Sequence, residues 1–255
     1  MIATFNADQF LPRTLESLAM QPGIASQDVE VIIMDGGSTD NTLAVVNSFP
    51  FIGRTVSEPD DGIYDAMNKG AKLATGRWLQ FLNAGDAFTR PDSLEKAIEA
   101  LKQADTGRSQ WAISAAQNLA GDSGPIRRIP SVPHVWWRHA YGLQPHCHQA
   151  TWFRRSTFLD SGAHALKYET ADDFDVILRF GLLTRPFTTT EVLIDYLGGG
   201  ISEVTAARRP KLQHKVRVDR FQLSSFGTWV DRKIGDAISV FNIARTVGGR
   251  LKSKF

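Results

Sequence analysis

Three aspartates crowd together just before a segment that is typical of a helix. Asp172, Asp173 and Asp175 precede the apolar residues 176–178 and Arg179. Like charges this close raise one another's pKa and a helix N-terminus lowers it, so the cluster could tune a carboxylate to act as a general base. The alternative is that all three only cap the helix and complement its dipole. Spacing alone slightly favours capping.

Polar clusters also follow three apolar runs. Residues 4–6 end the opening run, residues 35–40 follow the run 29–34, and residues 83–86 follow the run 78–82. Short, nearly continuous apolar runs that end in a turn are typical of buried parallel strands. Ligands bind beyond the carboxyl ends of such strands. Each cluster could also be a plain turn, but three at corresponding strand ends favour a ligand site.

Helical patterns separate these strands. Apolar residues recur at helical spacing over 10–20, 65–74 and 92–102, and residues 38–42 offer N-caps for a helix through Val46. The alternation predicts an α/β fold with a doubly wound, mostly parallel sheet. The sequence has no G-x-G-x-x-G after a strand and no Gly-Lys-Ser/Thr, which disfavours a Rossmann oxidoreductase and a P-loop protein. A first strand of usual length would need about three or four residues before Ile2, so we expect either a start upstream or a short central strand.

Composition excludes several other classes. The chain has 255 residues, of which 42% are hydrophobic and 22% charged, which is typical of a globular protein rather than a disordered one. Its single cysteine, Cys147, excludes an internal disulfide. The longest apolar stretches fall short of the roughly 18 residues that a membrane-spanning helix needs. No secretory leader is recognisable at the start, so we expect a cytoplasmic protein.

The net charge of +2 hides an asymmetry. Residues 1–203 carry 17 Lys/Arg and 24 Asp/Glu, whereas residues 204–255 carry 12 Lys/Arg and 3 Asp. An acidic body with a basic tail indicates an anionic partner or surface for the tail.

Taken together, the motifs resemble the family 2 glycosyltransferases of the GT-A fold. The closest resemblance is to members that build surface polysaccharides and glycolipids, such as the colanic-acid-type transferases. It extends from Thr4 to about Ser202, and it is carried by residues 4–6, 31–40, 58–70, 74–78, 81–86, 148–150, 171–175, 179 and 199–202.

The resemblance implies a nucleotide-sugar donor, held by residues that match the family's nucleotide pocket: Thr4, Asn6, Asp35, Asp60, Asp65 and Asn68. Residues 83–86 match its D-x-D metal motif, but Asn83 and Gly85 stand where many relatives have aspartate. We therefore expect Asp86, with Asn83, to bind Mg²⁺ or Mn²⁺ weakly and with help from the diphosphate, and we expect no organic cofactor. The alternative is that Asn83 and Gly85 only shape a turn.

The resemblance also implies inverting transfer. A diphosphate leaves well, so one base that deprotonates the acceptor hydroxyl is enough, and the resemblance assigns this role to Asp173. Asp172, His148 and Gln149 are expected in the donor or acceptor pocket. A soft-metal site at His146, Cys147 and His148 is disfavoured because the chain has no second cysteine. His148 could instead be a packed structural histidine.

Two segments keep alternatives open. Trp136, Trp137, Tyr141 and Trp152 could stack on a sugar or lipid acceptor, or could belong to the core. Residues 229–245 predict a basic amphipathic helix that docks on an anionic membrane surface, on the inner face of the plasma membrane, near a glycan or lipid-linked acceptor. The alternative is a helix that covers the acidic body.

The expected organisation is a nucleotide-sugar-binding half (1–110), an acceptor-binding half (111–203) and a tail (204–255). The alternative function is a non-catalytic nucleotide-sugar or glycan-binding module with a degenerate metal site. A nucleic-acid-binding protein is disfavoured by the acidic body, and a nucleotidyltransferase by the absence of a glycine-rich, basic loop after the first strand.

Overall fold

A four-stranded parallel sheet organises the N-terminal part of the chain. The computed structural model describes residues 1–25, 29–119, 127–129, 133–144, 146–198 and 208–252. The strand order is β3 (Arg54–Ser57), β2 (Ile32–Asp35), β1 (Ile2–Thr4) and β5 (Leu82–Asn83), and each neighbouring pair is parallel. The sequence therefore predicts the direction of this sheet correctly.

Side chains that alternate along β1 and β2 face two different layers of helices. Ile2 and Ile33 pack in one core cluster with the apolar face of α1 (Leu11–Ala19), and α3 (Thr42–Asn47) adds Val46. Ala3 and Ile32 pack on the other face with α4 (Ile63–Leu73). A short helix, α2 (Pro22–Ala25), follows α1. These layers are the doubly wound arrangement that strand–helix alternation predicts.

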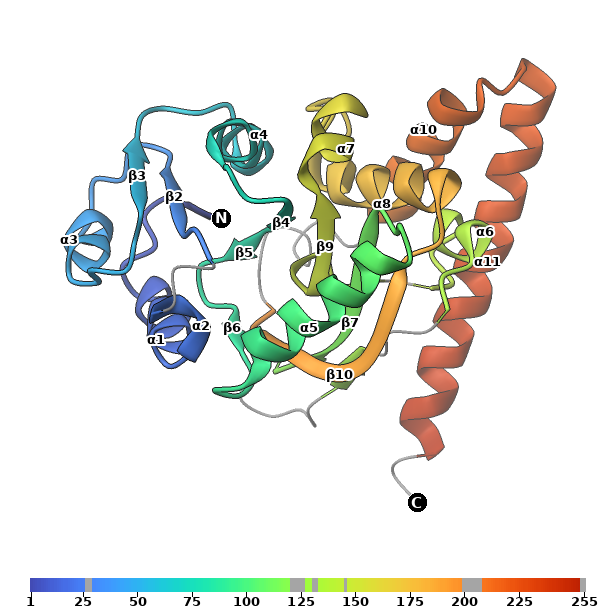
Figure 1. Ribbon diagram of the computed structural model, residues 1–255. Helices are drawn as coiled ribbons and strands as arrows, with labels where there is room; N and C mark the ends of the chain where they lie inside the picture. The colour runs from blue at the N-terminus through green and yellow to red at the C-terminus, as the bar shows by residue number, and fades with distance from the viewer. Residues whose placement is uncertain (26–28, 120–126, 130–132, 145, 199–207, 253–255) are drawn as a thin grey trace.

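A second, mixed sheet completes the body (Figure 1). Its order is β4 (Trp78–Gln80), β9 (Thr151–Arg154), β7 (Trp111–Asn118), β10 (Phe187–Tyr196) and β6 (Ala87–Phe88), with β8 (Arg127–Ile129) beside β7. Only β7 and β10 run parallel in it. Helix α5 (Ser93–Thr106) packs against β10 and β7.

The run 78–82, expected as one strand, is divided between the two sheets. Residues 78–80 form β4 in the mixed sheet, and β5 begins at Leu82 in the parallel sheet. Phe81, fully buried, is the residue at which the chain crosses. Both β4 and β6 belong to the expected half 1–110 and yet pair in the second sheet, so the two expected halves share this sheet. The polar turn after β5 consequently lies where the two sheets meet.

The remaining helices lie on the mixed-sheet side. They are α6 (Trp136–Ala140), the 3-10 turn η1 (His148–Ala150), α7 (Arg155–Asp160), the 3-10 turn η2 (Glu169–Ala171), α8 (Asp172–Leu183), α10 (Arg209–Phe221) and α11 (Ser225–Lys252). Helices α10 and α11 form a hairpin beside α8 and α6 (Figure 1). Among the residues that the structure describes, no helix is long and apolar enough to cross a bilayer.

A buried ion pair attaches this hairpin to the body. Arg217 of α10 is 2% exposed, contacts both carboxylate oxygens of Asp231 in α11, and donates to the carbonyl oxygen of Ala140 at 2.7 Å. Asp231 also accepts from the Tyr141 hydroxyl at 2.8 Å and lies 2.6 Å from Nδ1 of His214. The network fixes which face of α11 turns toward the body.

We expect Arg217→Met to lower the free energy of unfolding by about 3–5 kcal/mol, because it leaves the Asp231 carboxylate buried without its main partner. Thermal and urea unfolding measure this directly. Lys211→Met, at an exposed position on the same helix, is the matched control. Equal stability of the two variants would show that the ion pair does not anchor the hairpin.

Candidate active site

Three predicted clusters lie side by side at one edge of the parallel sheet. Thr4 at the end of β1 is in register with Asp35 at the end of β2, and Ala3 is in register with Asn83 at the end of β5. Because these strands are parallel and adjacent, their carboxyl ends present the three clusters to the same side. This is the position at which ligands bind in such sheets.

Asp35 is a buried carboxylate surrounded by donors. It is 2% exposed and accepts from the hydroxyls of Thr4 (3.1 Å) and Ser57 (2.7 Å) and from the hydroxyl and backbone N–H of Ser38. Burial by itself raises the pKa of Asp35, but the hydrogen bonds of Ser38, Ser57 and Thr4 outweigh it and bring the pKa below its usual value. Asp35 is therefore ionised and rigidly held.

The loops above Asp35 hold one another in place. Asn6 has a left-handed backbone (φ 46°), and its side-chain oxygen accepts from the backbone N–H of Thr39 at 2.9 Å. Asp60 accepts from the backbone N–H of Gly62 at 2.8 Å and lies against Gly36, where an added Cβ would meet its carboxylate at 2.7 Å. Glycine at position 36 therefore lets the loop after β3 close over the end of β2.

Asp65 and Asn68, both on α4, have different surroundings. Asp65 pairs with Lys69 at 3.1 Å near the start of the helix. Asn68 is buried, and its amide group bonds to both the carbonyl oxygen and the N–H of His164, each at 2.9 Å. The Asn68 side chain thus joins α4 to the loop before α8, whereas Thr4, Asp35 and Asp60 cluster at the sheet edge.

The turn after β5 presents two buried oxygen atoms that lack hydrogen-bond partners among the described residues. They are Oδ1 of Asn83 and Oδ2 of Asp86. The other carboxylate oxygen of Asp86 accepts from the backbone N–H of Leu197 at 2.9 Å. Burial raises the pKa of Asp86 to about 6, although backbone hydrogen bonds and the charge of Arg13 oppose it. Amide and carboxylate oxygens are ligands that Mg²⁺ and Mn²⁺ accept, so this pair fits a divalent cation.

Gly85 is explained by backbone geometry. Its φ of +100° is unfavourable for residues with a side chain, and an added Cβ would lie 2.7 Å from Cδ2 of Leu197. An aspartate at this position would displace Leu197 and strain the turn. The acidic triplet of the resembling family is therefore incompatible with this turn as it is packed here.

Asp173 lies in the wall of a cavity between the body and the C-terminal hairpin. The cavity has a volume of about 460 Å³, and His148, Gln149 and Cys147 line it together with Gln213 of α10 and Ile238 of α11. Burial raises the pKa of Cys147 to about 12, with further contributions from the charges of Asp86 and Asp173. One buried thiol thus lies near both carboxylates, which links the turn after β5 to the start of α8.

Tyr64 is a site residue that the sequence analysis did not select. Its ring packs against His164 with 4.9 Å between centroids, and its hydroxyl interacts with Asp173. Burial raises the pKa of Tyr64 well above its usual value, and the charges of Asp173 and Asp172 add to this. The only sequence signal was its place in the motif 58–70, since a tyrosine on a helix is more often part of the core.

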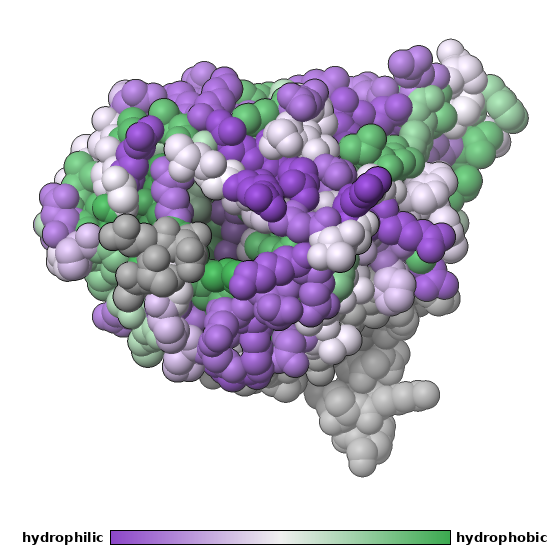
Figure 2. Space-filling model, in the orientation of Figure 1, coloured by the Kyte–Doolittle hydropathy of each residue, from purple (hydrophilic) through white to green (hydrophobic). Residues whose placement is uncertain are grey.

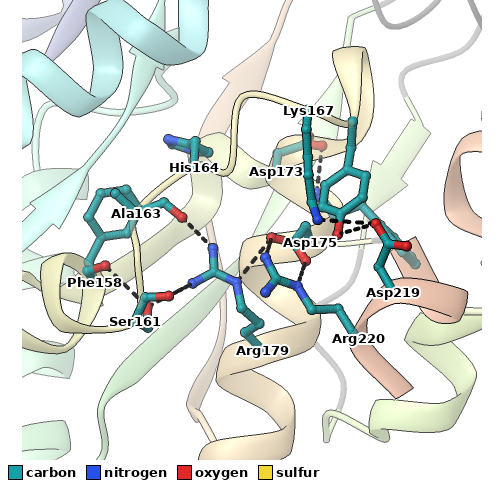
Figure 3. A network of polar contacts seen from close by, with 12 residues as sticks. Phe158, Ser161, Ala163, His164, Lys167, Asp173, Asp175, Arg179, Asp219 and Arg220 are labelled. Atoms are coloured by element: carbon teal, nitrogen blue, oxygen red, sulfur yellow. Dashed lines mark hydrogen bonds and ion pairs between the residues drawn. The ribbon is translucent and has the colours of Figure 1, made fainter. Parts of the chain in front are cut away.

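Arginine side chains anchor the start of α8 (Figure 3). Asp175, fully buried, accepts from Arg179 at 3.0 Å and from Arg220 of α10 at 2.5 and 2.7 Å. Arg179 also donates to the carbonyl oxygens of Ser161 and Ala163. The first-turn carboxylates therefore do different work: Asp175 holds the helix in place, and Asp173 remains at the cavity.

Asp172 is 1% exposed, and its Oδ1 is buried without a partner among the described residues. Burial raises the pKa of Asp172 from 3.8 to about 6, and the charges of Asp175 and Asp173 contribute. The folded chain thus holds this proton more tightly than the unfolded chain, so its contribution to stability is full below about pH 4 and is lost as the pH rises through 6.

As the pH rises from 4 to 7.5, the unmodified chain loses stability that Asp172→Asn does not lose. We therefore expect the free energy of unfolding of Asp172→Asn to increase, relative to that of the unmodified chain, by up to about 3 kcal/mol over this range. Urea unfolding at the two pH values measures this difference. Asp160→Asn, at an exposed position, is the control. A difference between Asp172→Asn and the unmodified chain that does not change with pH would contradict this prediction.

His148 and Gln149 lie beside Asp173 in the cavity wall, and His148 is 6% exposed. Burial lowers the pKa of His148, although the charge of Asp173 partly opposes this, and its Nε2 has no partner among the described residues. The ring also stacks on Phe81 with 5.5 Å between centroids. His148 is thus both packed and able to offer a nitrogen to a ligand. The described residues contain no group of three His, Cys, Asp or Glu that could hold a metal ion.

The four aromatic residues left open by the sequence separate clearly. Trp152 is core, at 5% exposed, and Tyr141 belongs to the Asp231 network. Trp136 and Trp137 are 43% and 45% exposed.

Of the motif residues, 199–202 lie outside the described part of the chain. A second cavity of about 320 Å³, next to α5, is mostly apolar and contains none of the predicted site residues.

Solved structures with this arrangement define the class of fold. Residues covering 91% of this chain superpose on 69% of Staphylococcus aureus TarS 1-349 in complex with UDP-GlcNAc, with a TM-score of 0.69 and 16% identity. The mannosyltransferase PcManGT from Pyrobaculum calidifontis, in complex with GDP-Man and Mn²⁺, matches the whole chain and 79% of its own length, with a TM-score of 0.63 and 14% identity. The fold is GT-A, as the sequence predicts.

Sequence comparison shows the family. The profile of glycosyl transferase family 2 matches residues 1–156. A PGL/p-HBAD biosynthesis glycosyltransferase of Mycobacterium bovis is 33% identical over 186 residues, which cover 70% of this chain and 67% of that protein. An uncharacterized glycosyltransferase of Mycobacterium tuberculosis is 33% identical over 201 residues, covering 78% and 74%. The chain therefore belongs to glycosyltransferase family 2.

Proposed function

We propose that this glycosyltransferase moves a sugar from a nucleoside diphosphate to an acceptor hydroxyl with inversion at the anomeric carbon. One observation supports the proposal: Asp35 and Asn83 lie at the carboxyl ends of parallel strands that both pair with β1, and the charges of Asp86 and Asp173 both raise the pKa of the buried Cys147 thiol beside the cavity. The complexes of TarS with UDP-GlcNAc and of PcManGT with GDP-Man support a nucleotide-sugar donor.

The residues divide the work of donor binding. Thr4, Asn6 and Asp35 at the sheet edge would receive the nucleoside, with Asp60 and Asp65 on the segment that covers it. Asn83 and Asp86 would hold a divalent cation weakly, together with the diphosphate. When bound, that cation neutralises the charge that grows on the leaving group. Asn68 would hold the segment that carries Asp60 and Asp65 in place, through its hydrogen bond to the carbonyl oxygen of His164.

Asp173 would supply the single base. Its carboxylate takes the proton of the acceptor hydroxyl, the hydroxyl oxygen attacks the anomeric carbon, and the bond to the diphosphate breaks with its electron pair on the leaving phosphate. His148, Gln149 and Asp172 line or adjoin the space between donor and acceptor. We propose a glycan or lipid-linked precursor of a surface glycan as the acceptor, in line with the biosynthetic relative of Mycobacterium bovis.

A thermal-shift screen of UDP-, GDP- and dTDP-sugars, with and without Mn²⁺, should identify the donor. NMR of the first sugar product formed from that donor then tests inversion, because an α-linked donor must give a β-configured product. Retention of configuration would refute the single-base mechanism. Donor binding without any turnover over a broad acceptor panel would favour a non-catalytic binding module.

A further inference from the structure

The outward side of the C-terminal hairpin carries an exposed aromatic stripe. Phe226 and Trp229 of α11 are 73% and 57% exposed, and their rings stack with 6.1 Å between centroids. Figure 2 shows hydrophobic residues gathered at the tip where α10 and α11 meet, at the upper right. Residues of this size are rarely left exposed side by side without a partner.

Basic residues continue the same stripe. Arg232 and Lys233 follow Trp229 by three and four residues, so they share its side of the helix, and both are exposed. One acidic residue, Asp236, is exposed a turn further on. The opposite side of α11 faces the body through the buried Asp231 and through Ile238, which lines the cavity. The Arg217–Asp231 pair thus turns Phe226 and Trp229 outward.

An exposed tryptophan of the body contacts the end of α10. Trp136 of α6 is 43% exposed and packs edge-on against Phe221 at the end of α10, with 5.9 Å between centroids. Trp137 beside it is also exposed, and the guanidinium of Arg138 lies 5.5 Å from its ring. We call Trp136, Trp137, Phe226, Trp229, Arg232 and Lys233 the aromatic–basic rim.

We propose that the aromatic–basic rim docks the protein on the surface of an anionic lipid bilayer, with α11 lying along it. Tryptophan and phenylalanine insert at the boundary between headgroups and acyl chains, and lysine and arginine beside them attract anionic lipids. The excess of 12 Lys/Arg over 3 Asp in residues 204–255 provides the complementary charge. Docking would bring the Asp173 cavity close to lipid-linked acceptors; this last link rests on the proposed function, whereas docking itself does not.

Co-sedimentation of the full chain with vesicles tests the proposal. We expect binding to vesicles of phosphatidylcholine with phosphatidylglycerol, and much weaker binding to phosphatidylcholine alone. Phe226→Ala/Trp229→Ala should lower the partition coefficient at least about tenfold, and Arg232→Gln/Lys233→Gln by up to about 30-fold. The matched controls are Leu182→Ala/Leu183→Ala, exposed at the end of α8, and Lys102→Gln on α5.

Equal binding to both kinds of vesicle, no binding, or binding that both rim variants retain would overturn the proposal. Preference for duplex DNA or an acidic protein over anionic vesicles would overturn it as well. Donor hydrolysis, measured on the same variants without vesicles, should be unchanged. If the unmodified chain hydrolyses the donor but does not bind vesicles, only the docking proposal is rejected. If it binds vesicles but no donor, only the proposed function is rejected.

Discussion

Asp173→Asn is expected to lower the rate of sugar transfer by about 10²- to 10⁴-fold, because an amide cannot take the proton of the acceptor hydroxyl. Donor binding should remain nearly intact, since the sheet-edge residues and the oxygen pair of Asn83 and Asp86 are unchanged. The measurement is release of nucleoside diphosphate at saturating donor, together with the dissociation constant of the donor.

Asp160→Asn, at an exposed position on α7, is the control and should turn over normally. The N-cap of α8 is Ala171, and Asp173 lies within the first turn, where its Oδ1 accepts from the backbone N–H of Phe174 at 2.6 Å. A role limited to capping would lower thermal stability and leave turnover of the folded fraction near normal. That outcome would remove Asp173 from the mechanism.

Asp86→Asn is expected to reduce cation-dependent turnover by about 10²-fold or more, because the cation and the diphosphate lose the charged ligand of the pair. Stability should be equal or higher, since a carboxylate oxygen buried without a partner among the described residues becomes a neutral amide. The two readouts are turnover as a function of Mn²⁺ concentration and thermal unfolding without metal.

Asp92→Asn, in an exposed ion pair with Lys96, is the control for charge removal. A purely structural role for Asp86 would give lower stability and an unchanged dependence on Mn²⁺, which is the opposite pattern. The combination of lost activity and retained stability is therefore specific to a ligand-binding role.

The parallel sheet was predictable because its signals are local. The apolar run before Asp35 and the polar turn after it specify both a buried strand and the end at which a ligand binds. The second sheet was not, because β7 contains three alanines, and β10 has three threonines after Phe187 and pairs with β7 through register shifts. Neither strand shows the alternation or the continuous apolar run that indicates a strand.

The sequence predicts which residues belong to the candidate site, but it does not predict which contacts each of them makes. The spacing of Asp172, Asp173 and Asp175 could not say that Asp175 would be held by Arg179 and Arg220, since Arg220 lies 45 residues away. The contact between Asn68 and His164 spans 96 residues and depends on the packing of α4 against the mixed-sheet side. Tertiary packing brings such long-range partners together, and patterns in a single sequence do not predict it.

Calorimetric titration of the donor with and without Mn²⁺ tests the central claim most directly. We predict that one nucleotide sugar binds the unmodified chain more tightly with Mn²⁺, that Asp35→Ala weakens binding under both conditions, and that Asp86→Asn abolishes only the effect of Mn²⁺. Asp173→Asn should bind as the unmodified chain does. Failure of every nucleotide sugar to bind, or binding that is indifferent to both Asp35 and Asp86, would contradict the account.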